Sequence, residues 1–233
     1  MKLSQLELSI IFPAYNEEDN IVEAVQRALF FVDSHAAEII VVDDGSIDST
    51  VQRLQPFQDT IKIVRHSKNQ GYGAALRIGF SHAKGRWVFF CDSDLQFPLD
   101  ALYEFLTYTH DYDLIIGYRF PRKDPRIRII NARIWRFLVN RSLGLSVRDI
   151  NCAFKLIRAS HLHSITLHAK GASINAELLT KLSSHRMIQL PVQHVPRIRG
   201  RQTGAYPRVI IRALRELAAL VYDVRFGTEI QKP

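Results

Sequence analysis

The sequence predicts a single α/β domain in which helices cover both faces of a mainly parallel β-sheet. Two patterns support this fold class. Short apolar runs alternate with amphipathic stretches through the first half of the chain, and short polar loops separate them. The run from Ile39 to Val42 is apolar at every position, which is typical of a strand buried on both faces. A length of 233 residues, 47% of them hydrophobic, is sufficient for one large core.

The predicted elements follow one another in strand–helix order. The first strand stops at Pro13, and the acidic residues 17–19 then suit the positive end of a helix dipole. Ser49 or Thr50 is expected to cap the helix after the second strand. We therefore expect strands at 8–12, 39–42, 61–64, 87–90 and 114–116, and helices at 21–32, after 49, at 73–82 and at 99–108.

Charge is divided unevenly along the chain. Residues 1–117 hold 9 Lys and Arg against 17 Asp and Glu, a balance of −8, whereas residues 118–233 hold 22 against 6, a balance of +16. Such asymmetry indicates two partners, one that needs carboxylates and one that is itself anionic. A basic face that serves only solubility is the alternative.

Two amphipathic stretches, residues 128–141 and 207–226, lie in the basic half, and both combine apolar residues with arginines. Basic amphipathic helices that carry aromatic residues bind membrane interfaces, whereas most amphipathic helices pack on a core. We expect the first stretch to meet a membrane interface and the second chiefly to pack on the core. No run approaches the ~18–20 apolar residues that span a bilayer, and the N-terminus lacks a signal-peptide pattern.

The stretch "FFCDSDLQFP" places two carboxylates, Asp92 and Asp94, directly after the apolar strand 87–90. Side chains at i and i+2 of an extended segment point to the same side. Two hard oxygen ligands so placed suit Mg²⁺ or Mn²⁺, especially when substrate phosphates complete the octahedron. The alternative is an acidic turn in which Asp94 caps the next helix, and the spacing alone does not separate these interpretations.

Several other signals exclude classes of protein. Gly71 and Gly73 precede a helix but lack the third glycine of a dinucleotide fingerprint, so a Rossmann dehydrogenase is disfavoured. Two cysteines, Cys91 and Cys152, do not make a disulfide framework, and a reducing compartment is expected. A zinc site is not expected, because no carboxylate or cysteine completes a recognisable spacing with the surface histidines His161, His163 and His168.

Four motifs stand in order along the chain: "IIFPAYNEEDNI", "VVDDGSIDST", "NQGYGAALRIGF" and "CDSDLQFPLD". "IIGYRF", "LGLSVRDINCAFKLIR" and "PVQHVPRIRG" follow in the basic half. Together they resemble family 2 glycosyltransferases of the GT-A fold, and most of all the dolichol-phosphate mannosyltransferase and polyprenyl-phosphate glycosyltransferase branch. The resemblance runs from about Leu8 to Gly204, and four ordered motifs are far more specific than one.

The resemblance assigns residues 1–117 to the nucleotide sugar. Tyr15 is expected beside the base, and Asp43 and Asp44 at the base or ribose; the alternatives are a packing aromatic and the start of a β-turn. Asp92 and Asp94 correspond to the DxD motif, as metal ligands with catalytic roles, and Gln96 to a third polar ligand. The remaining donor-site residues that the resemblance implies are Pro13, Ala14, Glu17, Lys68, Asn69, Gly73, Ser93, Arg197 and Arg201, the last in place of a lysine that relatives carry.

The resemblance assigns residues 118–206 to the acceptor and 207–233 to a C-terminal amphipathic helix and tail. Arg119 matches an arginine that meets an acceptor phosphate, and Arg133 is a second catalytic candidate, with Arg126, Arg128 and Arg136 as competitors. A phosphate acceptor is already an anion, so it needs positioning and charge stabilisation rather than a general base. Two acidic residues remain open: Asp149 as a base or a turn residue, and Glu177 as a site residue or a solvated helix charge.

The sequence therefore predicts a metal-dependent, inverting glycosyltransferase that uses Mg²⁺ or Mn²⁺ and a GDP- or UDP-linked sugar. The expected acceptor is a polyprenyl or dolichyl phosphate. The expected location is cytoplasmic, peripheral on the cytoplasmic face of an anionic membrane. Transfer to a soluble glycan or protein hydroxyl is the alternative within enzymes. A basic nucleic-acid-binding protein is the alternative outside them, but the arginines lack a recognised motif, so no nucleic acid partner is expected.

Overall fold

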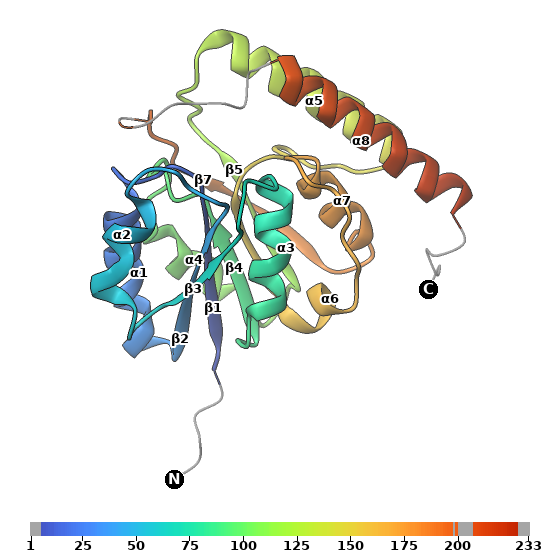
Figure 1. The fold of residues 1–233 in the computed structure, drawn as a ribbon. Helices are drawn as coiled ribbons and strands as arrows, with labels where there is room; N and C mark the ends of the chain where they lie inside the picture. The colour runs from blue at the N-terminus through green and yellow to red at the C-terminus, as the bar shows by residue number, and fades with distance from the viewer. Residues whose placement is uncertain (1–5, 198, 200–206, 228–233) are drawn as a thin grey trace.

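A computed structural model describes residues 6–197, 199 and 207–227 of the chain, and Figure 1 shows its fold. A single seven-stranded sheet runs through the molecule in the order β3-β2-β1-β4-β6-β5-β7. All pairs in it are parallel except those of β6, which runs antiparallel to both β4 and β5. The predicted α/β class with a mainly parallel sheet is confirmed.

The five predicted strands are all present, and two strands of the basic half were not predicted. The missed strands are β6, Phe154–Arg158, and β7, Met187–Val192. The others are β1 Leu8–Ala14, β2 Ala37–Asp43, β3 Lys62–Arg65, β4 Trp87–Cys91 and β5 Leu114–Arg119.

Helices cover both faces of the sheet. Those on one face are α1 Ile21–Ser34, α2 Thr50–Leu54 with the 3₁₀ turn η1 Gln55–Phe57, and α4 Ala101–Thr107. Those on the other face are α3 Tyr72–His82, α6 Ala159–His163 and α7 Ile174–Lys181. Two long helices, α5 Arg126–Leu143 and α8 Pro207–Phe226, lie side by side beyond the carboxyl ends of the parallel strands (Figure 1).

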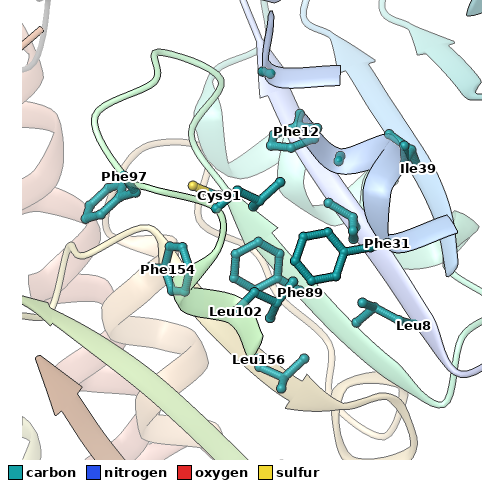
Figure 2. Close-up of a cluster of buried hydrophobic side chains, with 14 of the residues drawn as sticks. Leu8, Phe12, Phe31, Ile39, Phe89, Cys91, Phe97, Leu102, Phe154 and Leu156 are labelled. Atoms are coloured by element: carbon teal, nitrogen blue, oxygen red, sulfur yellow. The ribbon is translucent and has the colours of Figure 1, made fainter. Parts of the chain in front are cut away.

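Each face of the sheet carries its own apolar core, because successive strand residues point to opposite sides. In β4, Phe89 belongs to the core under α1 and α4, and Phe90 to the core under α3 and α7. Figure 2 shows the first core, where the Phe89 and Phe154 rings meet edge to face with centroids 4.7 Å apart. Aromatic contacts of this kind join the parallel half of the sheet to β6.

The pair α5 and α8 leaves apolar side chains in solvent. Within α5 only Val139 is buried, whereas α8 buries Leu217 and Leu220. The expectation of core packing for α8 therefore holds for its middle, and the start of that helix is more exposed. Among the described residues no helix is both long enough and apolar enough to cross a bilayer. The exposed apolar residues of α5 are Ile127, Ile130, Ile134 and Phe137, and those of α8 are Ile210, Ile211, Leu214, Tyr222 and Phe226.

Candidate active site

The carboxyl ends of β1, β2 and β4 meet at one edge of the sheet. Ala14 stands opposite Asp43 in the parallel register of β1 and β2, and β4 lies on the other side of β1. The loops that leave these strands therefore start side by side, where ligands bind in sheets of this type. Pro13 and Ala14 are buried in β1, and Tyr15, the next residue, is exposed at this edge.

Asp92 and Asp94 lie at the end of β4, both partly buried. Burial raises the pKa of Asp92 to about 7, and the charge of Asp94 adds to this shift. Burial also raises the pKa of Asp94. The helix-cap alternative for Asp94 is wrong, because α4 begins at Ala101 with Asp100 before it. Carboxylates whose ionised forms are disfavoured call for a nearby cation, so these residues fit the chemistry of Mg²⁺ or Mn²⁺.

Glu17 and Arg197 join this acidic edge to the far end of the chain. The guanidinium of Arg197 donates to both Glu17 carboxylate oxygens at 2.6 and 2.7 Å, and it lies 3.6 Å from Asp94 Oδ2. Asn20 donates a further hydrogen bond of 2.8 Å to Glu17. The predicted donor residues Glu17, Asp94 and Arg197 are thus brought together, while Arg201 lies outside the described residues.

Two predicted donor residues near the DxD motif hold the loops in place. Ser93 Oγ donates to the Pro13 carbonyl at 3.1 Å, which ties the end of β4 to β1. The side-chain amide of Gln96 donates to the Val195 carbonyl at 3.0 Å, and the Val195 N–H donates to the Gln96 backbone carbonyl at 2.9 Å. Gln96 therefore anchors the segment that carries Arg197, and its role as a metal ligand stays a prediction.

Asp43 and Asp44 are buried and engaged within the protein. Asp44 accepts hydrogen bonds from the backbone of Gln70 and Gly71 at 2.9 and 2.8 Å, and its Oδ1 lies 2.6 Å from His66 Nδ1. Asp43 accepts from the backbone N–H of Ser46 at 3.1 Å, as in the turn alternative. Both carboxylates shape the loops around the predicted nucleotide pocket, and their contacts with base or ribose stay predictions.

The third motif forms the outer part of this edge. Lys68 and Asn69 are exposed. Gly73 is buried, and its N–H donates to the Lys170 carbonyl at 2.8 Å. A Cβ at Gly73 would lie 2.4 Å from the Ala169 carbonyl oxygen, so only glycine permits this approach. Gly73 therefore fixes α3 against residues 169–171.

A basic cluster follows β5 at the same end of the sheet. Arg119 donates two hydrogen bonds to Asp149, from Nε at 2.7 Å and from Nη2 at 2.8 Å, and its Nη1 lies 3.5 Å from Asp124. Arg122 and Arg128 also pair with Asp124, at 2.7 and 3.2 Å. The cluster brings three guanidinium groups to two carboxylates, which leaves an excess of positive charge.

The ion pair changes the chemistry of Asp149. Burial acts to raise the pKa of Asp149, but the hydrogen bonds and charge of Arg119 outweigh it, so the pKa lies below its usual value. Burial acts to lower the pKa of Arg119, and Asp149 more than reverses this effect. A carboxylate held so firmly in its ionised form is a weak proton acceptor at neutral pH. The arrangement favours a positioning role for Asp149.

Among the arginines considered as a second acceptor residue, Arg128 shares an ion-pair partner with Arg119, namely Asp124. Arg133 lies on the exposed side of α5, whereas Arg122 and Arg128 share Asp124 with Arg119. Arg122 was missed because the only signal was its place in the charged run "RKDPRIR". The role of Arg133 at the acceptor stays a prediction.

A buried lysine under the site was also missed. Lys155 is fully buried in β6, where its ammonium donates to the Asn175 side chain at 2.8 Å, the Ile150 carbonyl at 3.2 Å and the Cys152 carbonyl. Three acceptors match the three N–H groups of an ammonium. Burial lowers the pKa of Lys155 to about 8. The lysine holds the turn that carries Asp149, and a lysine inside the apolar run "CAFKLIR" was its only signal.

Glu177 is a buried anchor rather than a solvated helix charge. Its carboxylate accepts hydrogen bonds from the backbone of His168 and Ala169 at 2.9 Å each, and it pairs with Lys181 at 3.1 Å. These contacts hold the loop that packs against Gly73. Glu177 therefore shapes the site from behind.

The expectation that no carboxylate accompanies the surface histidines needs correction for His161, which is partly buried. Side-chain atoms of Asp113, His161 and His185 lie within 4.8 Å of one another, at the amino ends of β5 and β7. Arg158 and Arg186 already pair with Asp113, at 3.0 and 3.4 Å. The two arginines oppose a cation there.

Comparisons with known proteins agree with the geometry. The sequence model of the family described as "Glycosyl transferase family 2" matches residues 9–166, more than half of the chain. The chain belongs to this family. The family 2 chain is similar to the undecaprenyl-phosphate 4-deoxy-4-formamido-L-arabinose transferase of Edwardsiella ictaluri (strain 93-146), with 29% identity over 224 residues. The match covers 93% of this chain and 66% of that relative, so the chain spans slightly less than two thirds of its length.

Solved structures show the same fold. The glucosyl-3-phosphoglycerate synthase of Mycobacterium tuberculosis in complex with phosphoglyceric acid matches with a TM-score of 0.68 and 23% identity, over 94% of this chain and 77% of that one. The same enzyme with Mn²⁺, uridine diphosphate and glucosyl-3-phosphoglycerate matches with a TM-score of 0.67 and 22% identity, again over 94% and 77%. The solved structures therefore show the fold, which is of the GT-A type, and the family match shows that this chain is a member of glycosyl transferase family 2.

Proposed function

We propose that this glycosyltransferase is a cation-dependent, inverting enzyme that moves a sugar from a UDP- or GDP-linked donor to a polyprenyl phosphate. One observation carries the proposal: an acidic edge and a basic cluster act on each other at the same end of the sheet. Burial raises the pKa values of Asp92 and Asp94, and the charges of Arg119 and Arg128 partly offset this rise at Asp92 and Asp94 respectively. Such a site suits a donor with a cation and an acceptor that is an anion.

On the donor side, Asp92 and Asp94 would hold Mg²⁺ or Mn²⁺. When bound, the cation neutralises the charge that develops on the pyrophosphate as the sugar leaves. Tyr15 offers an exposed ring at the mouth of the site, suited to stack on a base. A uridine diphosphate complex of a structural neighbour favours UDP-linked sugars for the first trials. GDP-linked sugars are the second donors to test.

On the acceptor side, the chain's own residues bind and orient a phosphate. Arg119, Arg122 and Arg128 carry the donors that a phosphate monoester accepts, and Arg is suited to bidentate binding of such groups. An oxygen of the acceptor phosphate would attack the anomeric carbon of the donor sugar directly. The bond from that carbon to the nucleoside diphosphate would break, and the nucleoside diphosphate would leave. Because the attacking group is already an anion, Asp149 is not needed as a base.

The helices α5 and α8 would bring the enzyme to its lipid. Both leave apolar side chains in solvent, and Phe137 of α5 is 68% exposed. Arg133 is exposed on the same helix and suits anionic headgroups. The similar protein of Edwardsiella ictaluri, which is named as an undecaprenyl-phosphate transferase, supports this acceptor class. We propose that the enzyme is a peripheral protein on the cytoplasmic face of a membrane.

A soluble acceptor is the second candidate, and the structural neighbours favour it. They include a complex with phosphoglyceric acid, a soluble compound that also carries a phosphate. The basic cluster by itself suits either phosphate. The exposed apolar residues of α5 favour the lipid, because a soluble acceptor requires no apolar surface.

The test is transfer by the whole chain. UDP- and GDP-linked radiolabelled sugars are incubated with Mn²⁺ or Mg²⁺ and either undecaprenyl phosphate in detergent or 3-phosphoglycerate in water. We expect cation-dependent label in the organic phase with the lipid only. Label on 3-phosphoglycerate, with none on the lipid, would replace the lipid proposal by the soluble one.

A further inference from the structure

Arg197 occupies the position between two carboxylates of the donor site. Its Nη2 donates to both Glu17 oxygens at 2.6 and 2.7 Å, while its Nη1 lies 3.6 Å from Asp94 Oδ2. The side chains involved are about one-tenth exposed, at 10% for Arg197 and 11% for each partner. Ion pairs this sheltered from water are screened much less than surface pairs.

The contact is built into the fold. Arg197 and Glu17 are 180 residues apart in the chain. Two hydrogen bonds between Gln96 and Val195 hold the arginine's segment against the DxD loop, and Arg197 Nε donates to the Arg199 carbonyl at 2.7 Å. The guanidinium is therefore aimed at the acidic edge by anchors on both of its sides.

Arg197 and a divalent cation need the same carboxylate. The Glu17 and Asp94 side chains are sheltered from water, so their negative charges need a nearby positive charge as compensation. The Arg197 guanidinium, 2.6 Å from Glu17 and 3.6 Å from Asp94, supplies part of that compensation. A bare cation that binds Asp94 would stand beside a fixed positive charge, and like charges at such distances repel.

A nucleoside diphosphate bound beside the cation changes the repulsion between Arg197 and that cation. Its phosphate oxygens are acceptors for a guanidinium, and Arg binds phosphates in the same bidentate way as carboxylates. Arg197 can then exchange the longer contact with Asp94 for a phosphate oxygen and keep the shorter contacts with Glu17. The anion thus removes the repulsion that a bare cation meets.

We propose that Arg197 makes the DxD site selective for a cation that binds together with a nucleoside diphosphate. Arg197 does so by competing with the bare cation for Asp94. This inference rests on the proposed cation and donor at Asp92 and Asp94, and it is independent of the acceptor. It separates two effects of one residue. Arg197 weakens binding of the cation alone and strengthens binding of the cation with its nucleotide.

The experiment measures both effects by calorimetric titration of the whole chain. The probes are Mn²⁺ alone, and UDP or GDP in the presence of saturating Mn²⁺. Arg197→Gln should bind bare Mn²⁺ on the order of tenfold more tightly and the Mn²⁺-nucleotide on the order of tenfold more weakly than the natural chain. Binding that Asp94→Asn leaves unchanged is assigned to other sites and subtracted.

Arg199→Gln is the matched control. Arg199 lies on the same segment, and its guanidinium contacts Asp19 and Glu23: it donates to the Asp19 carbonyl at 3.0 Å and lies 3.8 Å from the Glu23 carboxylate. We expect neither affinity to change in this variant. Arg197→Lys keeps the charge, so its affinity for bare Mn²⁺ should stay near that of the natural chain.

Unchanged or weaker binding of bare Mn²⁺ by Arg197→Gln would overturn the inference, as would an equal gain in Arg199→Gln. The natural chain gives a measure that does not depend on any variant. Binding of Mn²⁺ as tight without nucleotide as with it would also overturn the inference, because the coupling between the two ligands must be reciprocal and favourable. If the affinities for Mn²⁺ and for nucleotide change as expected but no sugar is transferred to undecaprenyl phosphate, only the proposal of a lipid acceptor is refuted.

Discussion

Asp149 and Arg119 lie 30 residues apart in the chain and form a two-point ion pair in which each fixes the charge of the other. The arginine comes from the end of β5 and the carboxylate from the turn before β6. The pair therefore joins two neighbouring strands at the edge where the acceptor is expected. Four predictions follow from this and related contacts.

Asp149→Asn should lower stability without removing donor binding. Loss of the Asp149 charge leaves the buried Arg119 with only Asp124 as a nearby carboxylate. We expect the free energy of unfolding to fall by about 3 kcal/mol, at the low end for a broken buried ion pair because Asp124 remains. Because the pKa of Asp149 is lower in the folded chain than in the unfolded one, the pair stabilises fully above about pH 4 and is lost as pH falls through the folded pKa. Urea unfolding of both proteins at pH 7 and near pH 3 should show the difference shrinking in acid.

A general-base role for Asp149 would give another pattern in the same variant. Transfer would then fall by roughly 10²–10⁴-fold, and the residual rate would change with pH as the attacking group ionises. A constant difference in unfolding free energy at both pH values would contradict the ion-pair account.

Arg119→Ala should lower transfer to the acceptor by orders of magnitude and leave nucleotide affinity nearly unchanged. Two or three charge-assisted hydrogen bonds are lost, each worth ~1.5–3 kcal/mol. Calorimetry with the nucleotide sugar and transfer to a short polyprenyl phosphate are measured on the same preparation. Arg126→Ala, exposed in the first turn of α5, serves as the control. A collapse of donor affinity in Arg119→Ala would assign this arginine to the donor instead.

Asp94→Asn should abolish the stimulation of nucleotide binding by Mn²⁺ and leave the fold intact. The neutral amide is a poor ligand for a hard cation. It also removes a buried charge whose raised pKa indicates an unfavourable ionised form, so the melting temperature should stay equal or rise by a few degrees. Thermal unfolding with and without Mn²⁺ and UDP or GDP checks both statements. Full Mn²⁺ stimulation in this variant would refute the metal assignment.

Phe137→Asp should weaken binding to anionic vesicles at least about tenfold, because it places a charge on the apolar surface of α5. Sedimentation with phosphatidylglycerol vesicles is the measurement. Phe30→Asp is the matched control, since Phe30 is 77% exposed on α1, a helix that covers a face of the sheet away from α5 and α8. Equal loss in both variants would indicate general charge repulsion rather than a membrane surface on α5.

Sequence patterns predict the parallel half of this fold well, because each strand there contains a short run of apolar residues and the helices between them are amphipathic. β6 and β7 escape such patterns for physical reasons. β6 places Lys155 inside the core, where three acceptors from other segments hold it. β7 contains Pro191, which is unusual in a strand.

The site divides in the same way. Asp92 and Asp94 follow a strand directly, so their position could be predicted from local spacing. The partners of Arg197 and Arg119 come from segments far away in the chain, and no local pattern specifies them. For the same reason Arg122, which shares Asp124 with Arg119, was not among the candidates that the sequence suggested.

The reversed direction of β6 has a consequence for how acceptor preference can change. Residues 120–153 leave the sheet at the end of β5 and return at the start of the adjacent β6, so both ends of this insertion are anchored side by side. The insertion carries Arg122, Asp124, Asp149 and the whole of α5, whereas the DxD motif lies outside it. A cassette with paired ends is suited to exchange between homologous enzymes as one piece, which would change the acceptor contacts around Arg119 while Arg119 and the nucleotide edge keep their own scaffold.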